Sequence, residues 1–67
     1  MSKLKRIQAK ARDLARSGRF FGWAPIAFEI RFEDGFEDAR EWLYRAATRD
    51  ELDRLSREAR ASNDAAA

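Results

Sequence analysis

The chain has 67 residues, which suffices for one domain that buries only about 60% of the surface its unfolded chain exposes. It contains neither cysteine nor histidine, which excludes disulfides, thiol nucleophiles and imidazole chemistry. We therefore expect no enzyme, no cofactor, no metal site and no small-molecule substrate. No apolar run reaches the roughly 18 residues of a membrane span, and no apolar stretch follows the basic start, which predicts a cytoplasmic protein. The excess of arginine over lysine and the many alanines are typical of GC-rich bacterial genomes.

The net charge of +2 conceals an uneven distribution along the chain. Residues 1–20 carry seven basic side chains against one acid, and residues 21–67 carry seven against eleven. Such asymmetry has two interpretations. The basic segment binds an anionic partner, or it lies against the acidic face of the same domain or of a second copy.

The first predicted helix spans Lys3 to Ser17. Ser2 is a suitable N-cap, and Gly18 is a suitable stop because glycine readily adopts the left-handed conformation. The apolar residues recur at spacings of three and four, as on one face of a helix: Leu4, Ile7, Ala11 and Leu14.

Residues 19–23 bring three large aromatic side chains together: Phe20, Phe21 and Trp23. A soluble monomer that exposed all three would carry a large apolar patch. We therefore expect this segment to be a buried linker that fills part of the core.

The segment after Pro25 is ambiguous. Residues 28–33 alternate apolar and charged side chains as a strand does, and Asp34-Gly35 resembles a hairpin turn. However, no second strand is visible in the sequence. The helical alternative places Trp23, Ile26 and Ile30 on one face and puts Pro25 in the first turn. We favour a helix over residues 26–34, with Gly35 as its C-terminal stop.

Two further helices are predicted. One runs from about Glu37 to Ala46, with acidic residues in its first turns where the helix dipole favours them. The other starts at Thr48, because Thr48 and Glu51 have the spacing of a capping box, and it continues to Arg60. Residues 1–61 would form a single helical domain, and residues 62–67 a frayed tail.

These elements predict an all-α fold, a compact bundle of three to four short helices. The expected core contains the large apolar side chains of the helical faces: Leu4, Ile7, Leu14, Phe20, Trp23, Ile26, Ile30, Phe36, Trp42, Leu43, Leu52 and Leu55. Three aromatic residues remain outside it, namely Phe28, Phe32 and Tyr44. They are the candidate contacts for a protein partner. The leading hypothesis is a small protein-interaction module whose partner is either another protein or a second copy of the chain.

The alternative hypothesis is a nucleic-acid-binding accessory protein that uses the basic first helix. Its positive side chains would neutralise phosphates, and Arg19 beside two phenylalanines offers charge together with stacking faces. The candidate contacts for this function are Lys3, Arg6, Lys10, Arg12, Arg16 and Arg19.

Residues 11–60 also show a pattern of small residues, aromatics and leucines. It comprises Ser17-Gly18-Arg19-Phe20, Gly22-Trp23, Ile26, Gly35-Phe36, Ala39-Arg40, Trp42-Leu43, Arg49, Leu52 and Leu55. The pattern resembles that of short helical proteins of proteobacteria and their phages, a family with no established activity. The resemblance implies a helix over residues 26–34 and implies nothing about function.

Overall fold

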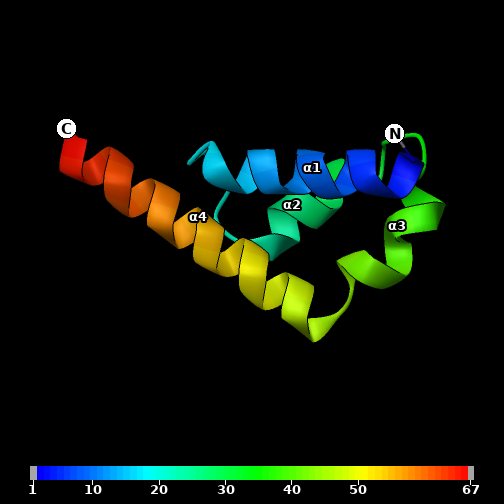
Figure 1. Ribbon diagram of the computed structural model, residues 1–67. Helices are drawn as coiled ribbons and strands as arrows, with labels where there is room; N and C mark the ends of the chain where they lie inside the picture. The colour runs from blue at the N-terminus through cyan, green and yellow to red at the C-terminus, as the bar shows by residue number, and fades with distance from the viewer. Residues whose placement is uncertain (1, 67) are drawn as a thin grey trace.

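The computed structural model describes the backbone of residues 2–66 and the side chains of residues 2–63. This part of the chain forms four helices and no strand: α1 (Lys3–Arg16), α2 (Trp23–Ile30), α3 (Phe36–Leu43) and α4 (Ala46–Ala66). In Figure 1, α1 and α4 converge toward the C-terminal end of α4, α2 packs against both, and α3 lies beside the N-terminus. The all-α prediction is confirmed.

The first helix has the predicted ends. The side-chain oxygen of Ser2 accepts a hydrogen bond from the backbone N–H of Lys5 at 3.1 Å, which satisfies one of the free amides of the first turn. Gly18 follows the helix with φ of 77°, a value that glycine adopts without strain. The N-cap serine and the glycine after the helix were therefore enough to locate the ends of α1 from the sequence.

The linker between α1 and α2 is only partly buried, which corrects the prediction. Phe20 and Trp23 are half-buried and pack against the core, whereas the side chain of Phe21 is 74% exposed. The segment turns at Gly18 and bends at Phe20 and Gly22, so the three side chains do not share one face toward the core. Phe21 instead lies under the guanidinium of Arg60 from α4, 4.6 Å from the centre of its ring.

The helical interpretation of the ambiguous segment is confirmed, but its predicted end is wrong. α2 stops at Ile30, its last buried residue, and residues 31–35 form turns. Gly35 does not close α2. Gly35 instead precedes the first residue of α3 and has a φ of 94°. A Cβ added at this position would lie 2.7 Å from the Cβ of Lys3. The glycine therefore marks the beginning of a helix, because it permits a close approach to α1.

The capping box predicted for the last helix is also wrong. α4 begins at Ala46, and the backbone N–H of Arg49 donates to the carbonyl of Arg45 at 3.0 Å. Thr48 is therefore inside the first turn, where it is 3% exposed, and α3 correspondingly ends at Leu43. At its other end α4 continues to Ala66, beyond the helix end predicted near Arg60. Fraying of residues 62–67 stays a prediction, and Ala67 lies outside the described residues.

The core is built from a few large aliphatic side chains and several alanines. Ile7, Ile26, Ile30, Leu43 and Leu52 are buried as predicted. The remaining predicted core residues pack around them in a partly buried shell: Leu4, Leu14, Phe20, Trp23, Phe36, Trp42 and Leu55. Four buried alanines were not in the predicted set, namely Ala11, Ala15, Ala27 and Ala39. Small side chains at these positions let the helices approach closely. This close approach leaves room at the centre of the core for only some of the large side chains.

Candidate functional site

Two exposed phenylalanines are in contact, Phe28 on the outer side of α2 and Phe32 in the turn that follows it. Phe28 is 58% exposed and Phe32 is 74% exposed. Their rings pack edge to face, with centroids 5.3 Å apart and planes inclined by 72°. This geometry is favourable for aromatic pairs. We call Phe28 and Phe32 the aromatic ridge.

The position of the ridge follows from the helical period of α2. Its inner face is occupied by Ile26, Ala27 and Ile30, which are all buried. Phe28 therefore points away from the core. Arg31 retains helical backbone angles (φ −57°, ψ −25°), so the chain continues in the same sense and brings Phe32 next to Phe28. Both residues lie outside the core, as predicted from the sequence.

Charged residues of opposite sign flank the ridge. Glu29 and Arg31 are both exposed, and within residues 2–63 neither forms an ion pair. In helical projection they lie on opposite sides of the line through Phe28 and Phe32. The ridge is therefore an apolar strip with a negative and a positive border.

Tyr44, the third predicted partner contact, does not join the ridge. It is 47% exposed at the end of α3, and its ring packs edge to face on Trp23 with centroids 5.4 Å apart. The guanidinium of Arg49 also lies over the ring of Trp23, with its central carbon 4.4 Å from the ring centre. The indole N–H of Trp23 also donates to the carbonyl of Leu43 at 2.8 Å. Tyr44 thus covers a structural tryptophan.

Most of the predicted nucleic-acid contacts form ion pairs within the chain. Lys3 and Arg6 both reach Asp34, at 3.5 and 3.6 Å, and Lys10 reaches Glu33 at 2.8 Å. Arg6 also donates to the backbone carbonyl of Asp34 at 2.6 Å. The basic face of α1 is therefore held against the acidic turn after α2, which is the intramolecular interpretation of the charge asymmetry.

Arg12 and Glu51 form the least exposed of these pairs. Two guanidinium nitrogens donate to the two carboxylate oxygens, at 2.7 and 3.3 Å, and join α1 to α4. The hydrogen bond from Arg12 is the main cause that lowers the pKa of Glu51 below its ordinary value, against the opposing effect of burial. The same bond raises the pKa of Arg12. Both groups are therefore stabilised in their charged forms.

Arg16 and Arg19 complete the predicted set. Both are exposed near the C-terminal end of α1, and no ion pair involves either of them within residues 2–63. The structure therefore separates the six predicted contacts into four that are paired with acids and two that are not.

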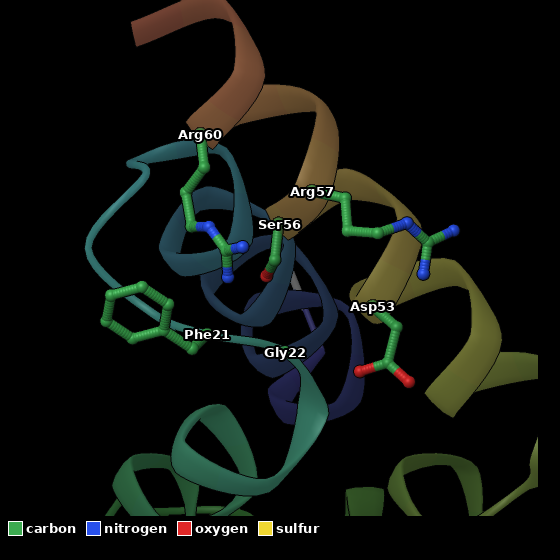
Figure 2. A pocket seen from close by; sticks show the side chains of 6 residues that line it. All are labelled: Phe21, Gly22, Asp53, Ser56, Arg57 and Arg60. Carbon is green, nitrogen blue, oxygen red and sulfur yellow. The ribbon is translucent and has the colours of Figure 1, made fainter. Parts of the chain in front are cut away.

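None of the surface pockets was predicted from the sequence, and one of them is lined by a buried serine. It lies between the linker and α4, measures about 190 Å³, and is lined by Phe21, Gly22, Asp53, Ser56, Arg57 and Arg60 (Figure 2). Ser56 and Arg60 are four residues apart on one face of α4, which is a visible signal in the sequence. The part of the lining that comes from the linker was not predictable, because the sequence led us to expect the whole linker, including Phe21, to be buried.

Comparisons with known proteins add no relative. No family model, curated protein or solved structure matches the chain. The resemblance to short helical proteins of proteobacteria and phages therefore stays a prediction. Within the described residues, no helix combines the length and the apolar character that a membrane span requires.

Proposed function

We propose that this chain is a non-catalytic protein-interaction module that pairs with a second copy of itself through the aromatic ridge. The observation that supports the proposal is the edge-to-face pair of Phe28 and Phe32, which are more than half exposed while the core is filled without them. Large exposed aromatics at the centre of an apolar strip are typical of residues that dominate binding energy.

The flanking charges favour a second copy as the partner. A two-fold axis parallel to α2 would bring the ridges of two copies face to face. The same operation places Glu29 of one copy opposite Arg31 of the other, on both sides of the strip. The surface is thus self-complementary in charge as well as in apolar character. Because the strip is small, we expect weak association in the micromolar range.

The direct test is light scattering coupled to size-exclusion chromatography, at about 10 to 500 micromolar protein. We expect the mass to rise from 7.8 kDa toward twice that value with concentration. The double variant Phe28→Ser/Phe32→Ser should stay monomeric. Phe21→Ser is the matched control, because Phe21 is as exposed as Phe32 but lies outside the ridge. A wild type that remains monomeric over the whole range contradicts the proposal.

A charge exchange tests the arrangement of the two copies. Glu29→Arg and Arg31→Glu should each weaken self-association, because each sets like charges opposite one another. An equimolar mixture of the two variants should associate again, since the arginines of one then face the glutamates of the other. If the mixture associates no better than either variant alone, the two-fold arrangement is wrong.

Nucleic-acid binding is the second candidate function. It is supported by Arg16 and Arg19, which carry exposed charge close in sequence to the exposed ring of Phe21. Fluorescence anisotropy with duplex and single-stranded oligonucleotides tests it at low and near-physiological salt. Binding that weakens steeply with salt and is lost in Arg16→Glu/Arg19→Glu supports this function. No binding at low salt contradicts it.

A further inference from the structure

The pocket between the linker and α4 contains a buried hydroxyl without a partner. Ser56 is 1% exposed, and its side-chain oxygen makes no hydrogen bond within the described residues. Figure 2 shows this hydroxyl directed toward the space between Phe21, Gly22 and Arg60. Serine in a helix usually satisfies its hydroxyl with the carbonyl four residues earlier, and buried polar groups are rarely left unpaired. Because this oxygen is itself covered, a partner that enters from the pocket reaches it only after a small movement of the neighbouring side chains.

Arg60 provides a cation at the same pocket. Its guanidinium lies over the ring of Phe21, and among residues 2–63 no carboxylate pairs with it. Stacking uses the face of a guanidinium and leaves the N–H groups along its edge free to donate. Arg57 also lines the pocket, although Figure 2 shows its guanidinium extending away from Phe21. The long flexible side chain allows Arg57 to turn toward a bound anion.

Asp53 is the acidic member of the pocket, and its role is already structural. One carboxylate oxygen accepts the backbone N–H of Trp23 at 2.6 Å, at the start of α2. With Arg57 and Arg60 it gives the lining a formal charge of +1. This balance suits a singly charged anion better than a doubly charged one.

We propose that this pocket binds the oxyanion group of a small molecule, a carboxylate or a singly charged phosphate. The anionic oxygens accept hydrogen bonds from the hydroxyl of Ser56 and from the guanidinium of Arg60. An adjoining pocket of about 330 Å³ shares Phe21 and Arg60 and also reaches Gly18 and Asn63. It offers room for the rest of the ligand beside the aromatic ring.

The test is a titration followed by the backbone amide NMR signals of the full chain. The probes are sodium acetate and sodium phosphate near pH 6, each compared with sodium chloride at equal ionic strength. We expect saturable shifts at Gly22, Trp23 and Ser56. Saturation by acetate alone, by phosphate alone or by both supports the proposal and identifies the preferred acidic group. Shifts that chloride reproduces overturn it.

Three variants locate the site. Arg60→Gln and Ser56→Ala should each weaken the apparent affinity at least tenfold. Arg54→Gln makes the same charge change on an exposed part of α4 outside the pocket, and we expect it to bind as wild type does. If Arg60→Gln and Ser56→Ala bind as well as Arg54→Gln, the proposal is overturned.

The melting temperature provides a second readout. An anion that binds the folded chain at this pocket should raise the melting temperature of wild type, and should raise that of Ser56→Ala less. An equal rise in the two proteins overturns the role of the hydroxyl in binding.

Discussion

The basic side chains of α1 and the aromatic side chains at and just after the outer face of α2 are both unusual in the sequence, and they have different surroundings in the fold. The surplus of positive charge on α1 is met by Glu33, Asp34 and Glu51 of the same chain. The surplus of aromatic side chains on α2 is not met, since Phe28 and Phe32 contact mainly each other and solvent. Charge asymmetry along a sequence is thus a poor indicator of a partner when the chain can fold its two halves together. The exposed phenylalanines are therefore the stronger candidates for a partner contact.

The largest effect that sharpens this comparison is expected within α2 itself. Ile26→Ala opens a cavity at a fully buried position and should lower the free energy of unfolding by about 3 kcal/mol. Phe28→Ala, two residues further along, should lower the free energy of unfolding of the monomer by only about 1 kcal/mol, because its ring loses the contact with Phe32. Urea denaturation at low micromolar protein measures both. A large loss in Phe28→Ala would mean that the ridge is a structural element.

A smaller effect is expected at the pair of Arg12 and Glu51. A double-mutant cycle with Arg12→Gln and Glu51→Gln should give a coupling free energy of about 0.5 to 1 kcal/mol, as for partly exposed ion pairs. Thermal or urea denaturation of the four proteins at neutral pH measures it. Coupling near zero would show that the contact between α1 and α4 is held by apolar packing alone.

The same pair predicts a dependence on pH. The pKa of Glu51 is lowered in the folded chain, so its contribution to stability is complete above the unfolded value of about 4.3. This contribution is lost as the pH falls through the lowered folded value. The difference in melting temperature between wild type and Glu51→Gln should therefore shrink from pH 7 toward pH 3. A difference that stays constant over this range contradicts the assignment.

The smallest effect is expected at the N-terminal end of α1. Asp34 is exposed and faces Lys3 and Arg6 at distances of 3.5 and 3.6 Å. Asp34→Asn should lower the free energy of unfolding by only a few tenths of a kcal/mol, and salt should reduce the effect further. Denaturation at about 20 mM and about 500 mM sodium chloride measures it, because the screening length differs severalfold between the two concentrations. A loss of more than about 1 kcal/mol in Asp34→Asn would contradict the expectation that this exposed pair contributes least to stability.

Residues with a single local role were predictable from the sequence, and residues with competing roles were not. Ser2 and Gly18 bound α1 through local capping chemistry, and the apolar period identified the inner face of α2. Gly35 and Thr48 carry capping signals too, yet Gly35 lies where α3 starts against α1, and Thr48 is buried in the first turn of α4. The buried alanines were not predicted for a similar reason, because only the packed arrangement of the helices shows where two of them cross. The ridge was predictable by elimination, while the pocket under Phe21 required the path of the linker.

The hydrogen bond from Trp23 to Asp53 spans 30 residues and has a consequence for folding order. A helix of eight residues is too short to persist alone in water, and the first amide of α2 is capped only once α4 has docked. Closing that loop costs conformational entropy before any contact of α2 is gained. We therefore expect α2 to form only after α4 has docked. Substitutions on the outside of α2 should then alter the unfolding rate and leave the folding rate nearly unchanged.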